Sequence, residues 1–130
     1  MVRWKPWNTE TLALARHSGR PLLVHVGYEG CEGSRAMAQE SFSDPATTRL
    51  LDEAFICVQV DRDALPELDR ALQLAHRLLT REDGGWPLNL FLTHDEALPF
   101  FGGGYFPPSS TAGQPDFHSV LARVAEYHRS

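Results

Sequence analysis

The chain has few cysteines, a deficit of basic residues and no long apolar run, and each shortage excludes a class of protein. Two cysteines in 130 residues are too few for a disulfide-stabilised scaffold. Acidic residues outnumber Lys plus Arg by 17 to 12, so we do not expect a nucleic-acid-binding surface. No stretch approaches the roughly 18 apolar residues that span a membrane, and the first ten residues lack a signal-peptide core. We therefore expect a cytoplasmic protein without a membrane segment.

The histidines give no sign of a metal centre. Six histidines are scattered along the chain, without an HExxH motif and without Cys or His pairs at zinc spacing. We therefore expect no metal and no other cofactor. The length fits one compact domain over residues 1–130, and the hydrophobic fraction of 42% is enough for one core.

Helical and strand-like segments alternate along the chain. The expected helices carry capping residues or apolar residues at helical spacing, and they cover 9–18, 31–42, 45–54, 65–79 and 117–124. In the fourth helix, Leu65, Leu68, Leu72, Ala75 and Leu79 fall on one face. The expected strands are short apolar runs, at 22–26, 55–60, 88–93 and 99–101.

This order of elements predicts an α/β fold. The first two strands are joined through a helix, so they should be parallel with a right-handed crossover. The last two are joined by a tight turn at His94-Asp95 and should be antiparallel. A helix–strand alternation that ends in a hairpin and a helix is the thioredoxin architecture. The prediction is a thioredoxin-like fold with a central, mixed four-stranded sheet and helices on both faces.

Cys31 follows the first strand across the loop Gly27–Gly30 and opens the next helix. Unpaired backbone N–H groups and the helix dipole at that position favour the thiolate, which is the attacking form of cysteine. We expect Cys31 to be solvent-accessible and more reactive than Cys57. The alternative is that Cys31 is an inert loop residue.

The residues around Cys31 argue against dithiol chemistry. A dithiol oxidoreductase needs a second thiol to resolve the mixed disulfide, and Ser34 stands three residues on instead. Ser34 can donate a hydrogen bond to a thiolate but cannot form a disulfide, while Glu32 opposes formation of the thiolate. Cys57 lies in a predicted buried strand, where cysteine behaves as a small hydrophobic residue.

Trp86-Pro87 stands directly before the third expected strand. In a thioredoxin fold this position holds a cis-proline that faces the reactive cysteine and exposes backbone for an extended substrate. We therefore place Trp86, Pro87 and the loop residue Tyr28 on a substrate-binding rim. The alternative is an ordinary trans proline at the start of a strand.

Two further polar residues are candidates for proton transfer. His25 lies six residues before Cys31, where thioredoxins commonly hold a buried acid, and a neutral imidazole can also move protons. Asp61 ends the second strand near the same rim of the sheet. The alternatives are a hydrogen-bonded core histidine and an aspartate that caps a loop.

Several motifs together resemble the thioredoxin-like domain family DUF255, which forms the N-terminal domain of spermatogenesis-associated protein 20 and occurs in its bacterial relatives. They lie along nearly the whole chain: Trp4, Trp7, Val26-Gly27-Tyr28, Cys31, Met37, Glu40-Ser41-Phe42, Val60-Asp61-Arg62, Leu68-Asp69, Gly84-Gly85-Trp86-Pro87-Leu88-Asn89, Phe91-Leu92-Thr93, Pro99-Phe100 and Tyr105-Phe106-Pro107. The resemblance implies the fold and the position of the site more firmly than a substrate.

The chain departs from the family pattern at the site itself. The family usually has Cys-His-Trp-Cys-His where this chain has Cys31-Glu32-Gly33-Ser34-Arg35. Two hypotheses follow: a monothiol protein that forms mixed disulfides with a protein or small-molecule thiol or disulfide, or a redox-inactive binding module. A third idea is a homodimer formed through the aromatic segment Phe100 to Phe106.

Overall fold

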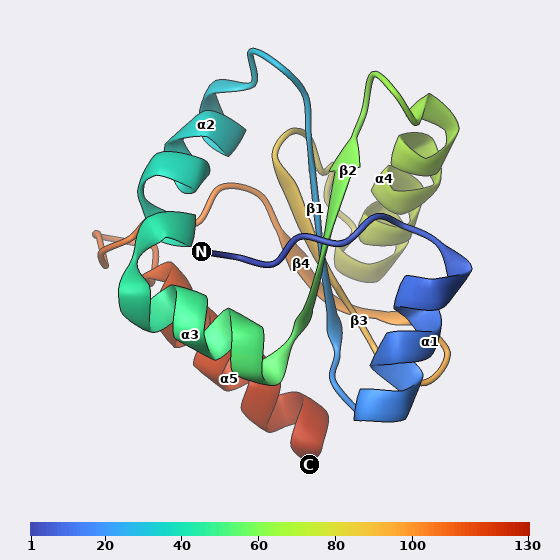
Figure 1. Cartoon of the computed structure of the whole chain (residues 1–130). Helices are drawn as coiled ribbons and strands as arrows, with labels where there is room; N and C mark the ends of the chain where they lie inside the picture. Colours follow the sequence, from blue (N-terminus) through green and yellow to red (C-terminus); the bar gives the residue numbers. More distant parts are fainter.

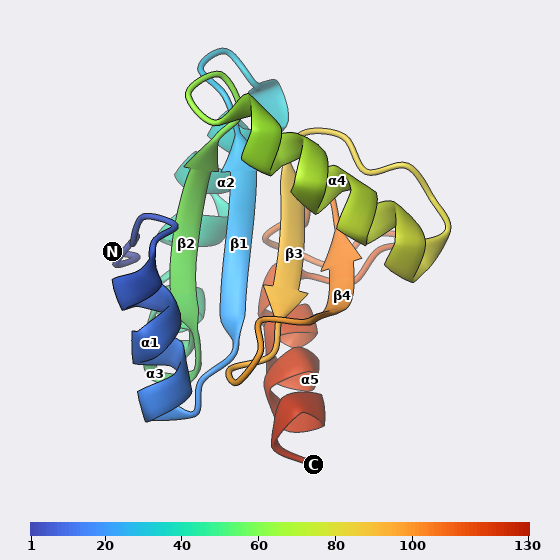
Figure 2. The ribbon, with the colours of Figure 1, turned by 90° about the vertical axis from the view of Figure 1, so that its right-hand side faces the viewer.

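The four strands form one mixed sheet in the order β2-β1-β3-β4 (Figure 2), described from a computed structural model of residues 1–130. The strands are β1 (Leu22–Gly27), β2 (Ile56–Asp61), β3 (Leu88–Leu92) and β4 (Pro99–Gly103). β1 runs parallel to β2 and antiparallel to β3, and β3 runs antiparallel to β4. The predicted parallel first pair and antiparallel last pair are confirmed.

Helices cover both faces of this sheet (Figure 1), as the sequence predicts. One face carries α1 (Thr9–Ser18) and α4 (Pro66–Thr80), and the other carries α2 (Glu32–Gln39), α3 (Pro45–Ala54) and α5 (Phe117–Arg129). A membrane-spanning segment is not found among these helices.

The helix boundaries follow from local capping chemistry. The side chain of Asn8 accepts a hydrogen bond from the Thr11 N–H at 2.8 Å, and Gly19 ends α1 in the left-handed conformation. Asp44 caps α3 before Pro45, and Asp116 caps α5 through Ser119. These hydrogen bonds hold the carboxyl pKa of Asp44 and Asp116 below the usual value.

The helix predicted over residues 31–42 is correct except at its C-terminal end. α2 ends at Gln39, and a 3-10 turn, η1 (Ser41–Ser43), leads into α3. Serine hydroxyls replace the helical hydrogen-bond pattern here: Ser41 Oγ donates to the Phe106 carbonyl at 2.7 Å, and Ser43 Oγ donates to the Ala38 carbonyl at 2.5 Å. The turn also places Phe42 in the core.

The core is divided by the sheet into two apolar clusters. Alternate β1 residues supply both of them, because successive side chains of a strand point to opposite faces. Leu23 joins the cluster beneath α3 and α5, which also contains Phe91 and Phe117. Leu22 and Val24 join the cluster beneath α1 and α4.

The predicted apolar stripe of α4 is only partly correct. Leu72 is buried, but Leu65 and Leu79 are 44% and 39% exposed, and the buried face instead includes Asp69 and His76. Asp69 contacts the loop before β3, and His76 lies against β4. The Trp86 indole N–H donates to Asp69, and Gly102 in β4 lets His76 approach the sheet, since a Cβ at Gly102 would meet the imidazole at 2.6 Å.

Two segments outside the helices complete the packing. The N-terminal residues lie along the outer edge of β2, where the Lys5 N–H donates to the Cys57 carbonyl at 2.8 Å and the Gln59 N–H donates to the Lys5 carbonyl at 3.1 Å. Among the aromatic residues near the C-terminus, Phe106 stacks on Phe117 and Phe100 stacks on Tyr127. These rings therefore pack largely on α5.

Candidate functional site

Cys31 is the N-cap residue of α2. Its N–H donates to the Tyr28 carbonyl, and its carbonyl accepts from the Arg35 N–H, both at 3.0 Å. Its side chain makes no capping hydrogen bond, unlike the side chains of Asn8 and Asp44 at α1 and α3. The expectation that Cys31 is solvent-accessible is wrong, because only 4% of the residue is exposed. The thiol is therefore positioned at the helix start but largely covered.

The start of α2 lies directly against the loop before β3. A Cβ atom at Gly33 would clash with Pro87 Cδ, so a glycine is required for this approach. The Trp86–Pro87 peptide bond is cis. The Trp86 side chain is 41% exposed, so this loop presents an aromatic surface next to the beginning of the helix.

The hydroxyl of Ser34 forms its hydrogen bond with His25, not with the Cys31 thiol. Its Oγ lies 3.2 Å from Nε2 of His25, and Nδ1 of His25 lies 2.7 Å from Oδ1 of Asn89. The Asn89 amide nitrogen donates to the Gly104 carbonyl, so its oxygen is the acceptor that faces the imidazole. Three side chains from α2, β1 and β3 thus form one continuous hydrogen-bonded chain.

His25 is buried in this chain. Burial lowers the pKa of His25 below its ordinary value of 6.5, and the hydrogen bond to Asn89 opposes this effect without reversing it. The imidazole also packs edge-on against Phe42 and lies 5.9 Å, centroid to centroid, from Trp4. It is therefore a neutral histidine with both ring nitrogens engaged at neutral pH.

A second cluster lies on the exposed side of the loop. Tyr28 and Trp86 meet edge to face, and the Arg62 guanidinium lies 3.7 Å from the centroid of the Tyr28 ring and 4.7 Å from that of Trp86. The indole N–H of Trp86 donates to Asp69 at 3.0 Å. The structure thus brings together Tyr28 and Trp86, which the sequence analysis placed on one rim, and adds Arg62 between them.

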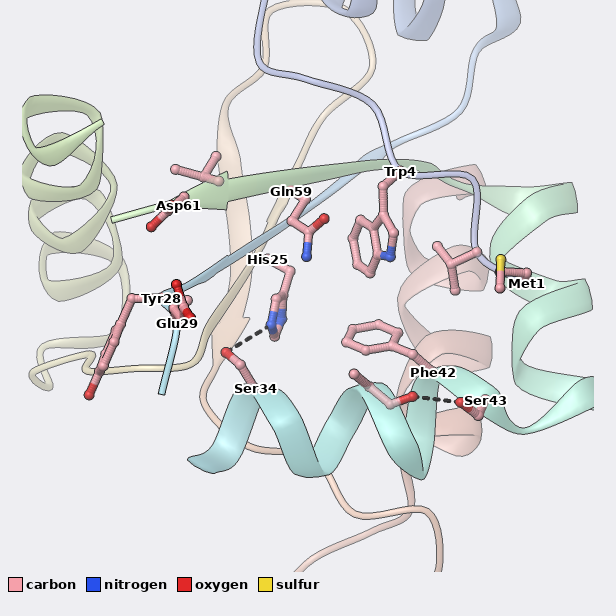
Figure 3. Close-up of a pocket in the computed structure, with 14 residues that line it drawn as sticks. Met1, Trp4, His25, Tyr28, Glu29, Ser34, Phe42, Ser43, Gln59 and Asp61 are labelled. Atoms are coloured by element: carbon pink, nitrogen blue, oxygen red, sulfur yellow. Dashed lines mark hydrogen bonds between the residues drawn. The ribbon is translucent and has the colours of Figure 1, made fainter. Parts of the chain in front are cut away.

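A pocket of about 600 Å³ opens beside the Ser34–His25 pair (Figure 3). Trp4 and Phe42 form its apolar wall, Gln59 lies opposite His25 in the β1–β2 register, and Asp61 lies at its rim. Cys31 does not line this pocket. The Ser34 hydroxyl therefore faces this pocket, whereas Cys31 is not part of its wall.

The two remaining candidates have structural partners. One carboxylate oxygen of Asp61 accepts from the Asp63 N–H at 2.9 Å, which is the loop-capping contact considered in the sequence analysis. Cys57 is buried in β2, and burial raises the pKa of its thiol to about 12. Asp52 adds to this rise and Arg20 opposes it. Cys57 is thus a poor nucleophile at neutral pH.

The sequence analysis missed the residues that complete these clusters. Asn89 stands inside an apolar strand, and a polar residue in an otherwise buried run is a signal that could have marked it. Arg62 follows Asp61 in the sequence, but nothing there shows that its guanidinium turns back over Tyr28. Gln59 reaches the pocket through its pairing with His25 in the sheet, and Trp4 reaches it through the pairing of the N-terminal residues with β2.

The sequence is similar to known proteins along its whole length. The family described as "Protein of unknown function, DUF255" matches residues 1–130. Spermatogenesis-associated protein 20 from Mus musculus is 38% identical over 125 residues, and the human protein of that name is also 38% identical over 125 residues. Each alignment covers 96% of this chain and 16% of the relative, so the chain spans about a sixth of those proteins.

Solved structures show the same fold. A thioredoxin from Thermus thermophilus superimposes with a TM-score of 0.70 and 26% sequence identity, over 98% of this chain and 89% of that one. A structure titled "DsbH Oxidoreductase" superimposes with a TM-score of 0.69 and 12% identity, over 98% of this chain and 85% of that one. The second likeness concerns the fold alone.

Proposed function

Because the chain belongs to the DUF255 family and has a thioredoxin-like fold, we propose that it is a monothiol protein whose Cys31 forms mixed disulfides. The observation that carries this proposal is the position of Cys31 at the N-cap of α2, beside the Pro87 loop and without a capping hydrogen bond. The thioredoxin fold supports a thiol–disulfide or binding role in general. The single-cysteine mechanism is a more specific proposal than this general role.

The proposed reaction is one thiol–disulfide exchange. The Cys31 thiolate attacks one sulfur of a protein or small-molecule disulfide, a new S–S bond forms, and the other sulfur leaves as a thiolate. An external thiol then attacks the mixed disulfide and restores Cys31. The chain itself supplies no resolving thiol, since position 34 is serine and burial holds Cys57 in its thiol form.

The substrate would lie across the rim formed by Tyr28, Trp86 and Pro87. Trp86 offers an exposed ring, and the Arg62 guanidinium holds the Tyr28 and Trp86 rings in one cluster. An extended peptide could pair with the backbone next to Pro87. His25 would serve proton transfer only indirectly, through the Ser34 hydroxyl that occupies its Nε2.

A redox-inactive binding module is the second candidate. The observation that favours it is the burial of Cys31, whose 4% exposure limits access by a disulfide. A rim of tyrosine, tryptophan and arginine is typical of protein-binding surfaces. In this case the thioredoxin-like fold presents the rim, and the cysteine contributes to packing.

Reaction with oxidised glutathione separates the two candidates. We expect the native protein to gain one glutathione by intact mass, and peptide mapping to place it on Cys31. A Cys31→Ala variant should gain none, and a Cys57→Ala variant should react as the parent does. An unmodified native protein whose thiols react only in denaturant would favour the binding module, and an adduct on Cys57 would contradict the assignment of the site.

A further inference from the structure

We propose that Ser34 is a second nucleophile, activated by His25, and that it reacts with small uncharged carboxylic esters bound in the pocket of Figure 3. Ser34, His25 and Asn89 have the connectivity of a hydroxyl–imidazole–amide triad, in which a base accepts the hydroxyl proton and a third group orients the base. This activity would be independent of Cys31, which does not line the pocket.

The hydrogen bonds assign the proton on the imidazole. The Asn89 side-chain nitrogen is within donating distance of the Gly104 carbonyl at 2.6 Å and of the Met37 sulfur at 3.4 Å, which leaves Oδ1 as an acceptor. His25 must therefore carry its hydrogen on Nδ1 to donate to that oxygen at 2.7 Å. Its Nε2 then has a free lone pair and accepts the Ser34 hydroxyl proton.

The protonation state of His25 suits a general base. Burial lowers its pKa from 6.5, so the imidazole is neutral and able to accept a proton at physiological pH. The packing of Phe42 and Trp4 around the ring fixes its plane. Gly27 is also required, because a Cβ there would clash with Ser34 Oγ and move the hydroxyl away from Nε2.

The pocket lining limits the substrate class. Its volume of about 600 Å³ is in the range of small-molecule sites. Trp4, Phe42 and Val60 provide apolar contact, while Glu29 and Asp61 are its only charged side chains. Two carboxylates and no Lys or Arg disfavour an anionic ligand, so an uncharged ester with a short aliphatic or aromatic acyl group fits best.

The reaction balances with water as the only co-reactant. Ser34 Oγ forms a bond to the carbonyl carbon as its proton passes to His25 Nε2, and the alkoxide leaves with that proton. Water, deprotonated by the same imidazole, then releases the acid. Donors near the developing oxyanion are the Ser34 N–H, which has no helical acceptor in the first turn, and the Gln59 amide, which points into the pocket (Figure 3).

The test uses p-nitrophenyl acetate and butyrate with the full chain carrying Cys31→Ala, because a thiol also reacts with activated esters. We expect hydrolysis above the buffer rate, and a loss of about 100-fold or more in Ser34→Ala and in His25→Gln. Ser18→Ala is the control, since Ser18 is an exposed serine of α1 outside the pocket, its Oγ donates to the Ala15 carbonyl, and its loss should leave the rate unchanged.

Two further readouts separate catalysis from a structural role. A fluorophosphonate probe should modify Ser34, by peptide mapping, and should spare Ser43. The hydrolysis rate should decrease as the pH is lowered, with a midpoint below pH 6.5, because the base is a histidine with a lowered pKa. Absence of hydrolysis in the Cys31→Ala protein, or an unchanged rate in a Ser34→Ala variant with native circular dichroism, would overturn the proposal. Neither result bears on mixed-disulfide formation by Cys31.

Discussion

Burial of the His25 imidazole affects both the stability of the protein and the chemistry of the site. A buried imidazole with an unsatisfied ring nitrogen costs about 1–3 kcal/mol. Here Asn89 and Ser34 satisfy both nitrogens, so the side chain can remain neutral inside the protein. Burial that favours the neutral form in the folded state must also make stability depend on pH.

We predict that the free energy of unfolding decreases as the pH falls from 7.5 to 5. The pKa of His25 is lowered in the folded protein, so below pH 6.5 the unfolded chain binds more protons. Stability is therefore fully present above that value and is lost below it, by up to about 1.4 kcal/mol per pH unit. Urea denaturation at several pH values measures this slope.

A His25→Gln variant should show a shallower slope over the same pH range. His128→Gln is the control, because burial and His94 also lower the pKa of His128 and add a smaller contribution. The carboxylates of Asp44, Asp95 and Asp116 titrate at lower pH and do not affect this window. Parallel curves for the parent and His25→Gln would contradict the prediction.

The two cysteines differ in how well the sequence predicts their burial. The burial of Cys57 follows from its apolar strand, and the structure agrees. The position of Cys31 at a helix start follows from the glycine loop before it. Its low exposure could not be predicted in this way, because burial depends on the packing of segments that are distant in the sequence, such as the Pro87 loop against Gly33 of α2.

At the scale of elements, two glycines allow α2 to lie close to β1 and to the Pro87 loop. Gly27 at the end of β1 accommodates Ser34, and Gly33 in the first turn of α2 accommodates Pro87. Alanine normally stabilises a helix by about 1 kcal/mol relative to glycine. Glycine at position 33 therefore lowers the helix propensity of α2 but permits its close approach to the Pro87 loop.

We predict that Gly33→Ala destabilises the protein by about 1–3 kcal/mol, the usual cost of overpacking, despite the better helix propensity of alanine. The same variant should alter the rate at which Cys31 reacts with oxidised glutathione, because α2 must move away from Pro87. Urea denaturation measures the loss of stability, and intact mass measures the rate of the glutathione reaction.

Gly104→Ala is the matched control for this variant. A Cβ at Gly104 would lie 3.4 Å from the Pro87 carbonyl oxygen, which is an ordinary contact. It should therefore change stability much less than Gly33→Ala. A Gly33→Ala protein that is more stable than the parent would show that α2 does not press on Pro87.

The helices also show where periodicity fails as a predictor. Caps at Asn8 and Asp44 depend on neighbours three residues away, and the sequence predicts such local contacts well. The face of α4 depends on distant partners instead. A spacing of leucines cannot indicate that Trp86 will donate a hydrogen bond to Asp69, or that Gly102 will make room for His76.

At the scale of the molecule, one sheet couples two cores. β1 lies between β2 and β3 and sends alternate side chains into each apolar cluster. The pocket belongs to this level as well, since it needs the N-terminal residues paired with β2, the turn that carries Phe42, and His25 in β1. No single segment of sequence contains the pattern of such a pocket.

We predict that damage to one core unfolds the whole chain in a single transition. Phe117 is fully buried in α5 and contacts Phe42 and Phe106, so Phe117→Ala should lower stability by about 3–5 kcal/mol. Leu90→Ala removes a side chain from the opposite cluster and should cost about 2–5 kcal/mol. Because both clusters share β1, tryptophan fluorescence and far-ultraviolet circular dichroism should give coincident urea transitions in both variants. Separate midpoints in the Phe117→Ala protein would show that the two faces of the sheet unfold independently.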